Sequence, residues 1–269
     1  MASEEPAVGY DPLYSTFDSP VMREVRREAY AEDIGQHSWV TADELRSDLE
    51  RLALGPASRL IDLGCGPCGP LVFAVQSTGC LGVGLDSSAA ALVSGKSRAS
   101  ENGVEARVTL QEADLDLPMP VESRSFDAAI SLDVVLHLRD RSAFFREVAR
   151  ILAANGKFLF TDAAVVTGPI SSEEIAHRSA TGHAQFAPAG FNEEMLAASG
   201  FRLLEREDRT ASVVRNASGR RNAMITRRTE LEQMLGPEAL ARQIRYLDAV
   251  IALSERRALS RILFLAEPA

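Results

Sequence analysis

The sequence predicts an α/β protein with an open, mostly parallel sheet and helices on both of its faces. Short apolar runs alternate with segments of helical periodicity between residues 56 and 161, as they do in parallel sheets. A glycine-rich turn follows the first apolar run, and a carboxylate lies at or soon after the end of each of the first three. Since ligands of such sheets bind beyond the carboxyl ends of the strands, these residues mark the expected site.

The expected elements follow from the apolar runs and their capping residues. Strands are predicted near residues 59–63, 81–85, 106–111, 126–131, 157–161, 201–207 and 260–265. Helices are predicted at 21–32, 42–54, 70–78, 88–101, 141–152 and 172–178, and within 212–258. Thr41 is the expected N-cap of the second helix, and Asn192 that of a short helix ended by Gly200. The stripe of Leu240, Ile244, Leu247 and Ile251 predicts a helix face in the core.

The chain divides into two expected regions. Residues 1–55 form an N-terminal helical cap or lid, and residues 56–269 form the main domain. Within the main domain, segments 162–190 and 211–259 interrupt the alternation and are expected to be insertions on the substrate side. The second of these insertions is helical.

Composition excludes several classes of function. A net charge of −9 over 269 residues leaves no basic excess for nucleic acid. No apolar run approaches the length that spans a membrane, and the acidic start Met1-Ala2-Ser3-Glu4-Glu5 lacks the apolar core of a signal peptide. The three cysteines do not form a disulfide framework, so a cytoplasmic protein without a nucleic-acid or membrane partner is expected. A homodimer is left open.

The segment Asp62-Leu63-Gly64-Cys65-Gly66-Pro67-Cys68-Gly69-Pro70 is the most informative part of the chain. A glycine turn between strand and helix exposes backbone N–H groups and lets a ligand approach the main chain. Asp62 would repel a phosphate and attract an ammonium group. Asp86, at the end of the next strand, can accept hydrogen bonds from ribose hydroxyls, and Asp114 from the exocyclic amine of an adenine.

In this order, the motifs resemble those of the class I, Rossmann-like methyltransferases that depend on S-adenosylmethionine. The resemblance covers residues from about 36 to the C-terminus and rests on Asp62–Gly66, Asp86, Ala113-Asp114, Phe126–Asp133 and Leu152–Phe158. It implies a Rossmann-like sheet of seven strands, mostly parallel, with the final strand antiparallel. It also implies S-adenosyl-L-methionine as the cofactor. The implied cofactor-binding residues are Gln36, Ser38, Trp39, Asp62, Gly64, Cys65, Gly66, Asp86, Ser87, Asp114, Leu115 and Asp133.

Two features of the turn need their own interpretation. Cys68 stands where the family often has a third glycine, and its side chain would narrow the room beside the cofactor. Cys65 and Cys68 have the spacing of a redox or zinc motif, but no second cysteine pair exists and no histidine lies nearby. We therefore expect small side chains in a tight turn and no metal.

An alternative cofactor must be weighed. Gly64-x-Gly66-x-x-Gly69 matches the dinucleotide fingerprint, and Asp86 stands near its acidic position. Asp62 would sit badly beside a pyrophosphate, however, and Pro67 removes a backbone donor from the turn. A methyltransferase is favoured over an NAD(P)-dependent oxidoreductase. A non-catalytic protein that binds S-adenosylmethionine remains a third reading.

The segment Glu32–Trp39 resembles the N-terminal segment of small-molecule methyltransferases of the glycine, sarcosine and dimethylglycine group. There, the segment closes over the cofactor. The resemblance implies that Gln36 and Ser38 bond the methionine carboxylate and that Trp39 packs against the cofactor, although a core position for Trp39 is an equal alternative. The resemblance favours nitrogen as the atom that accepts the methyl group, and oxygen and carbon stay open.

Methyl transfer from a sulfonium is an in-line displacement that gains most from positioning and a dry pocket. His137 is the candidate base because a histidine can hold a proton near neutral pH; the alternative is that it fixes the loop backbone. The predicted function is methyl transfer to a small-molecule acceptor. The candidate acceptor-binding residues are Tyr10, Tyr14, Phe17, Asp162 and His183.

Overall fold

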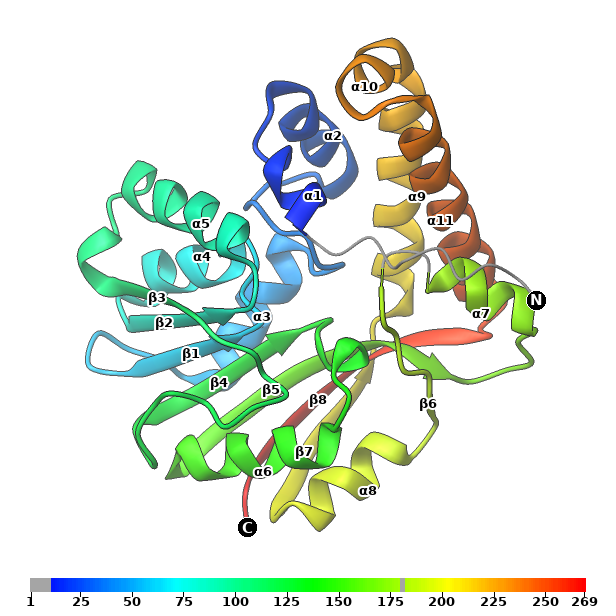
Figure 1. Ribbon diagram of the computed structural model, residues 1–269. Coiled ribbons are helices and arrows are strands. Elements are labelled where there is room, and N and C mark those ends of the chain that lie inside the picture. Colours follow the sequence, from blue (N-terminus) through cyan, green and yellow to red (C-terminus); the bar gives the residue numbers. More distant parts are fainter. Residues whose placement is uncertain (1–10, 180–181) are drawn as a thin grey trace.

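The computed structural model describes residues 11–179 and 182–269 and shows one twisted sheet with helices on both faces (Figure 1). The strand order is β3-β2-β1-β4-β5-β8-β7, and the short β6 pairs with β5 beside this path. All neighbours are parallel except β8, which runs antiparallel to both β5 and β7. The Rossmann-like α/β fold and its antiparallel final strand are confirmed, with β6 as an additional short strand.

The strands keep the predicted positions and differ mainly in length. They are β1 Arg59–Leu63, β2 Leu81–Asp86, β3 Val108–Glu112, β4 Phe126–Leu132, β5 Leu152–Val166, β6 Ala187–Pro188, β7 Phe201–Asp208 and β8 Leu259–Pro268. Strand β5 is longer than predicted at both ends: it begins at Leu152, which pairs with Phe126 of β4, and its residues beyond Asp162 continue to pair with the start of β8. The first part of the expected 162–190 insertion therefore belongs to the sheet.

The helices also follow the prediction closely. They are α1 Asp11–Ser15, α2 Pro20–Tyr30, α3 Ala42–Leu52, α4 Gly69–Thr78, α5 Ala89–Glu101, α6 Arg141–Ile151, α7 Ser172–Arg178, α8 Phe191–Ala198, α9 Thr210–Thr226, α10 Arg228–Leu235 and α11 Pro237–Glu255, with short 3₁₀ turns at Glu105–Arg107 and Val135–His137. Thr41 caps α3 in a reciprocal capping box with Glu44, as predicted. Asn192 is not the cap of α8: Gly190 takes that place at φ +92°, and the Asn192 amide is buried against Asp162.

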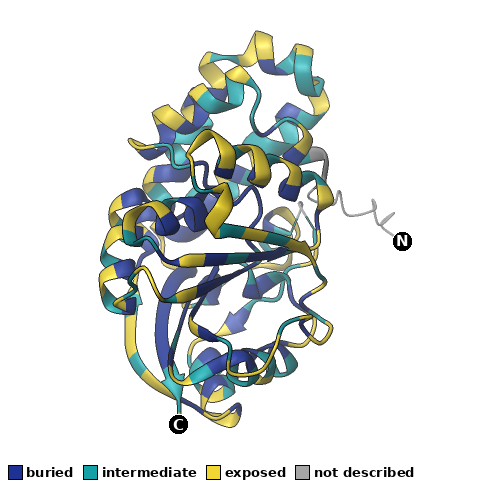
Figure 2. Ribbon diagram, turned by 90° about the vertical axis from the view of Figure 1, so that its left-hand side faces the viewer, coloured by how far each residue is buried: buried dark blue, intermediate teal, exposed yellow. Residues whose placement is uncertain are grey.

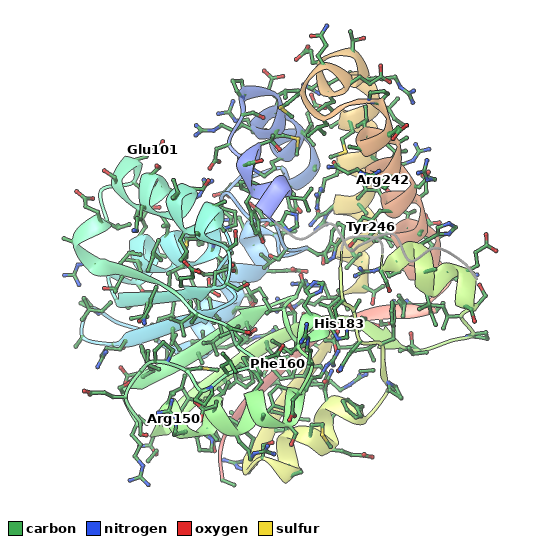
Figure 3. All side chains as sticks on the ribbon, viewed as in Figure 1. Glu101, Arg150, Phe160, His183, Arg242 and Tyr246 are labelled. Atoms are coloured by element: carbon green, nitrogen blue, oxygen red, sulfur yellow. The ribbon has the colours of Figure 1, made fainter. Side chains whose placement is uncertain are left out.

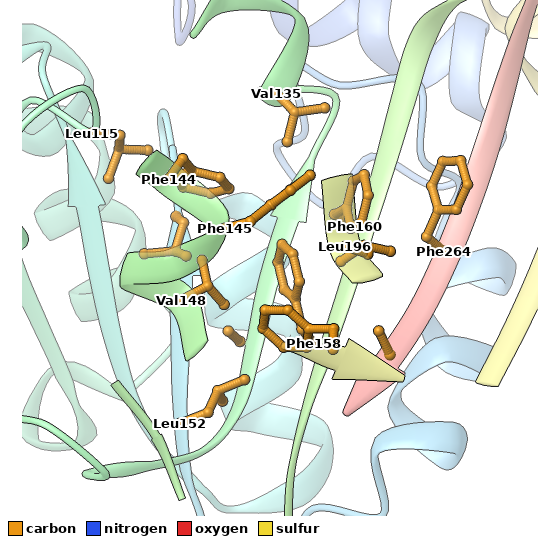
Figure 4. Packing of buried hydrophobic residues seen from close by; sticks show 14 of the residues in the cluster. Leu115, Val135, Phe144, Phe145, Val148, Leu152, Phe158, Phe160, Leu196 and Phe264 are labelled. Carbon is orange, nitrogen blue, oxygen red and sulfur yellow. The ribbon is translucent and has the colours of Figure 1, made fainter. Parts of the chain in front are cut away.

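Two apolar layers hold the helices against the sheet. On one face, α6 and α8 cover an aromatic row in which Phe158 stacks on Phe160 with ring centroids 4.9 Å apart (Figure 4). On the other face, leucines of α3 and α4 pack with Leu60 and Leu159 of the sheet. Buried residues follow the strands and the inward faces of the helices, and exposed residues face outward (Figure 2).

A third apolar cluster lies outside the sheet and joins the N-terminal helix α2 to the helices α9, α10 and α11. Helices α9, α10 and α11 form a separate helical wall beside the sheet, and α1 and α2 lie between α5 and α9 (Figure 1). Helix α3, although inside the expected 1–55 cap, packs into the sheet core through Leu45 and Leu49. The part of the N-terminal region that faces the helical wall is thus α1, α2 and the loop that follows them. Among the described helices, none has the length and apolar character needed to cross a membrane.

Candidate functional site

A cavity of about 400 Å³ lies beyond the carboxyl ends of β1, β2, β3 and β4. It contains most of the residues singled out in the sequence. Its lining includes Asp62, Gly64, Cys65, Gly66, Asp86, Ser87, Asp114, Leu115 and Asp133, together with Tyr14, His37, Ser38, His137 and His183. We call it the cofactor cavity. Carboxylates and backbone N–H groups from three strand ends therefore converge on one space, as the sequence predicts.

The glycine turn shapes one wall of this cavity. Gly64 and Gly66 both have positive φ, +82° and +52°, a conformation that favours glycine. A Cβ at Gly64 would lie 2.5 Å from a methyl of Val134, and one at Gly66 would lie 3.2 Å from the Tyr14 hydroxyl oxygen. Any larger residue at Gly64 would therefore displace the loop after β4. The turn therefore tolerates few substitutions at its glycines.

Cys68 does not narrow the cofactor cavity. Its backbone is left-handed at φ +60°, as a glycine would be, and its side chain is buried below the turn, where a Cβ on Gly95 would lie 2.5 Å from its sulfur. The Cys65 and Cys68 sulfurs are 3.4 Å apart, and this contact together with burial raises the pKa of Cys65. The expected loss of room is wrong, because the thiol points away from the ligand side.

Asp62 is the most perturbed acid of the cavity. It is 2% exposed. Burial, with a contribution from Asp86, raises its pKa to about 8. A cationic group placed beside it would restore its charge. Asp62 therefore fits the ammonium end of an amino-acid-like ligand better than a phosphate.

Asp86 and Asp114 are held by backbone amides. The Asp86 carboxylate accepts from Gly66 N at 2.8 Å and from Ser88 N at 2.9 Å, which ties the end of β2 to the glycine turn. Asp114 accepts from Asp116 N at 2.9 Å. A carboxylate can accept about four hydrogen bonds, which suits a ribose hydroxyl at Asp86 and an amine at Asp114.

Ser38 supplies a direct test of fit for an amino-acid cofactor. Its hydroxyl oxygen is buried and has no hydrogen-bond partner among the described residues, yet Ser38 lines the cavity. Buried polar groups in native proteins are almost always paired, so a ligand group is the natural partner. With Asp62 for the ammonium, Ser38 for the carboxylate and Asp86 for the ribose, the residues present fit S-adenosylmethionine. The described residues contain no cluster of metal-binding side chains.

A second cavity, of about 90 Å³, lies between the sheet and the helical wall. We call it the acceptor cavity. Its apolar lining comes from Leu13, Phe17, Met22, Val25, Trp39, Leu136, Ala163, Met224, Leu235 and Leu247, and its polar lining includes Arg26, Tyr30, Gln36, Arg178, Arg220, Gln243 and Tyr246. His37, Ser38, Asp133 and His137 line both cavities. The two spaces therefore meet at these four residues.

His137 lies at this meeting point with a defined tautomer. Its Nδ1 is 2.8 Å from the carbonyl oxygen of His183, and a carbonyl only accepts, so Nδ1 carries the proton. Burial lowers the pKa of His137 to about 4, which keeps the ring neutral at pH 7. The lone pair is then on Nε2. His183, exposed and predicted to touch the acceptor, lines the cofactor cavity instead (Figure 3).

Asp133 joins three parts of the chain at the boundary. Its carboxylate accepts from Trp39 N at 2.8 Å, from Thr161 Oγ1 at 2.8 Å and from Arg261 Nε at 2.8 Å. Its backbone is left-handed at φ +61°. Through these three bonds Asp133 holds the 36–39 loop against β5 and β8.

Some predicted residues lie elsewhere than expected. Trp39 and Gln36 line the acceptor cavity and not the cofactor cavity; the Gln36 amide is bonded to its own loop, accepting from Ile34 N at 2.9 Å. Tyr14 lines the cofactor cavity, whereas Phe17 lines the acceptor cavity as predicted. Tyr10 lies outside the described residues.

Asp162 lines neither cavity. It is fully buried and bonded to Arg141 at 2.6 Å and to Asn192 at 2.9 Å. The Asp162 carboxylate is bonded to Arg141 and Asn192, so it stabilises the packing of α6 and α8 against β5. The expectation of a substrate contact is not supported by this placement.

Sequence reasoning missed most of the acceptor cavity. The missed residues are mainly on α2, α7, α9 and α11, and they include Arg26, Tyr30, Arg178, Arg220 and Tyr246. The periodicity of α11 predicts its packed face but not the neighbouring face that lines a cavity. Ser88 and Asp116 of the cofactor cavity were also missed, although each lies next to a predicted residue.

A doubly wound sheet with acids at three strand ends and an orphaned serine at the cofactor cavity defines a protein that binds a nucleoside-linked amino acid. Residues 61–160 match the family model described as "Methyltransferase domain". This part of the chain is a methyltransferase domain of the class I, S-adenosylmethionine-dependent kind, and its methyl donor is S-adenosyl-L-methionine.

Similar proteins support this placement. The chain is 27% identical over 223 residues to the sarcosine/dimethylglycine N-methyltransferase of Halorhodospira halochloris, covering 77% of this chain and 76% of that one. It is 30% identical over 116 residues to methyltransferase GfsG of Streptomyces halstedii, covering 43% and 41%. A crystal structure titled as a putative sarcosine dimethylglycine methyltransferase from Galdieria sulphuraria has a TM-score of 0.80 at 23% identity, covering 96% of this chain and 98% of that one. This last similarity shows the fold.

The alignment to GfsG spans less than half of that relative, whereas the alignment to the Halorhodospira enzyme spans about three quarters of it. These similarities do not assign the acceptor molecule of this chain.

Proposed function

We propose that this protein transfers a methyl group to a nitrogen, oxygen or carbon atom of a small molecule held in the acceptor cavity. The observation that carries the proposal is that the two cavities meet at His37, Ser38, Asp133 and His137. A donor in one cavity and an acceptor in the other would face each other there. S-adenosylmethionine would supply the methyl group on a sulfonium: as the acceptor bonds the methyl carbon in line, the S–CH₃ bond breaks and S-adenosylhomocysteine leaves as a neutral thioether.

The chain itself would hold the two reactants in place and keep water out of the acceptor cavity. Apolar side chains of α2, α9 and α11 exclude water from the acceptor side, and Asp133 fixes the loop that carries Ser38. Holding two reactants in line can supply up to ~7–11 kcal/mol of the barrier in ideal cases. Positioning is therefore expected to dominate the rate.

His137 is the proposed base for acceptors that arrive protonated. Nδ1 is occupied by the His183 carbonyl, so Nε2 is the atom that would accept the proton. The lowered pKa keeps the ring neutral at pH 7, which is the form that can accept. A structural role in holding the segment around His183 is the alternative, and it is separated by the activity test described in the Discussion.

The test is a calorimetric titration with S-adenosylhomocysteine, with NAD as the control ligand, followed by an acceptor screen that measures S-adenosylhomocysteine release. Binding of S-adenosylhomocysteine alone, with release in the presence of one acceptor class, is the expected result. Binding of NAD instead would favour an oxidoreductase and would remove the role given to Asp62. Tight binding without release for any acceptor would favour a non-catalytic cofactor-binding protein.

A further inference from the structure

The acceptor cavity contains two arginines without a carboxylate partner among the described residues. Arg178, on α7, is only 4% exposed. Its guanidinium donates to the Tyr246 hydroxyl at 2.9 Å and lies 5.3 Å from the centre of that ring. Arg220, on α9, lies 5.4 Å from the centre of the Trp39 ring. Neither guanidinium has an acidic oxygen within ion-pair distance in the described part of the chain.

The other charges of this cavity are already balanced. Arg26 is paired with Asp33 at 3.0 Å and with Asp18 at 3.4 Å. Asp133, the one acid that lines the cavity within the described residues, is paired with Arg261 at 2.8 Å. The balance that remains is positive, from Arg178 and Arg220.

A buried guanidinium without an anion is costly, because desolvation of its charge is not repaid by a partner. Proteins retain such groups where a ligand completes the pair, and arginine suits planar anionic oxygens in particular. The hydroxyl of Tyr246 accepts from Arg178, so its own proton is free to be donated to the same ligand. Tyr246, on α11 and labelled in Figure 3, lines the acceptor cavity.

The remaining lining is apolar. Met22, Val25, Met224, Leu235 and Leu247 contribute hydrocarbon or thioether surface from four helices, α2, α9, α10 and α11. Methionines adapt to irregular apolar ligands. Such walls suit a carbon skeleton and give little to a fully polar molecule.

We infer that the acceptor is an organic anion with an apolar skeleton, a carboxylic acid or an ionised phenol, whose anionic oxygen binds Arg178 while Arg220 adds a second positive charge. The inference rests on the proposed function and deepens it. It concerns the charge and shape of the acceptor and is compatible with transfer to nitrogen, oxygen or carbon. An acceptor whose only charged group is an ammonium would be repelled by both arginines.

Arg178 and Arg220 line the same cavity as the two histidines at the boundary, His37 and His137. Arg178 contributes to the lowered pKa of His137, and Arg220 contributes to that of His37. In both cases burial is the larger cause. The positive groups that face the boundary are Arg26, Arg178 and Arg220, and Asp133 is the acid that faces them.

The experiment titrates the protein, saturated with S-adenosylhomocysteine, with three compounds of one skeleton: benzoate, benzamide and benzylammonium. Benzoate is expected to bind at least about tenfold more tightly than the other two, the usual gain for a hydrogen bond to a charged group. 4-Nitrophenolate, compared with benzoate, distinguishes a phenolate site from a carboxylate site. Equal binding of benzamide or tighter binding of benzylammonium would overturn the inference without any variant, as would the absence of binding by both anions.

Variants then locate the anion. R178M is expected to weaken benzoate binding about tenfold or more and to leave S-adenosylhomocysteine and benzamide binding unchanged. R245M is the matched control, since Arg245 lies on α11 with its side chain exposed and outside both cavities. Unchanged benzoate affinity in R178M would overturn the inference. If R178M does not fold, Tyr246→Phe gives the second test, with weaker benzoate binding expected.

The result separates this inference from the proposed function. Benzoate binding through Arg178, with no methyl transfer to any acceptor, would support the anion site and count against a methyl-transfer reaction. Transfer to neutral or cationic amines as fast as to anionic acceptors would support the reaction and overturn the anion site.

Discussion

Arg261 Nε lies 2.8 Å from Asp133 Oδ1, with the arginine side chain fully buried and the aspartate side chain 6% exposed. The same guanidinium also holds Glu44 at 2.9 Å. Arg261 is on the final strand β8, Asp133 follows β4, and Glu44 is in the first turn of α3. One cation thus joins the far end of the chain to the loop between the two cavities.

The first prediction concerns this buried pair. R261M would leave Asp133 and Glu44 without their shared cation, and breaking a buried ion pair from one side costs about 3–5 kcal/mol. Chemical denaturation is expected to show a loss of that size. R202Q is the control, because Arg202 pairs with Glu267 on the surface with 66% of its side chain exposed, and such pairs contribute up to ~1 kcal/mol. Equal losses in the two variants would contradict the role given to Arg261.

The second prediction concerns the proton on Asp62. Its pKa of about 8 leaves it protonated at pH 7 in the free protein, and an adjacent ammonium would lower that pKa. Binding of S-adenosylhomocysteine should release close to one proton at pH 7, and the release should fall to about half at pH 8 and vanish only well above the pKa, where the free protein is already ionised at Asp62. Calorimetry in phosphate and in Tris buffer measures the released proton. D62N should bind without buffer dependence and more weakly; no buffer dependence in the wild type would refute the contact.

The third prediction tests His137 as a base. H137Q should reduce kcat for an acceptor that arrives protonated, toward the lower end of the ~10²–10⁴-fold range of general bases because a ring with a pKa near 4 is a weak base, while the S-adenosylhomocysteine Kd changes little. Since the ring is neutral above about pH 4, kcat should show no inflection from this group near the usual histidine value. Stopped assays from pH 5 to 8 check this. Full activity in H137Q would assign His137 to holding the loop.

The fourth prediction follows from the same lowered pKa in the folded state. The unfolded chain binds a proton at His137 below about pH 6.5, but the folded protein does so only near pH 4, so stability is lost as pH falls through this window. Between pH 7 and 5 this group should cost the wild type about 2 kcal/mol. Denaturation of the wild type and H137Q at both pH values should show a smaller loss in the variant. An equal loss would mean that the folded ring titrates normally.

The fifth prediction concerns the contact between the glycine turn and the 33–36 loop. A Cβ at Gly69 would lie 2.3 Å from the backbone carbon and oxygen of Gly35, so G69A must push the loop away. We expect weaker S-adenosylhomocysteine binding, because that loop precedes Ser38, and a lower Tm. G55A is the control: nothing lies within 4 Å of its Cβ, and the loss of backbone freedom in the unfolded chain should leave stability unchanged or slightly higher. Equal behaviour of the two variants would argue against the contact.

The sequence predicted the sheet and the cofactor side well because both are encoded locally. Strand β1 has the predicted bounds, and Asp62, Asp86 and Asp114 line one cavity because parallel strands end at one edge. Asp162 also lies near the carboxyl-terminal part of a strand, yet it forms a buried ion pair with Arg141 and does not reach a cavity. That pairing depends on how α6 packs against β5, which local patterns do not report.

The acceptor cavity was largely unpredictable for a similar reason. Arg178 and Tyr246 are far apart in sequence, and their contact depends on the packing of α7 against α11. Trp39 was expected beside the cofactor but faces the acceptor side, because its backbone N–H is held by Asp133. Tertiary contacts of this kind decide which of the two cavities a residue lines.

The antiparallel strand β8 also has a consequence for the order of assembly. It lies between β5 and β7, and its Arg261 is needed to hold the loop at the boundary of the cavities. A chain emerging from a ribosome presents residues 259–268 after all the other strands, so the neighbours of β8 must wait with open edges. The cofactor-side strands can pair early, but the geometry for transfer is completed only when that last segment enters the sheet.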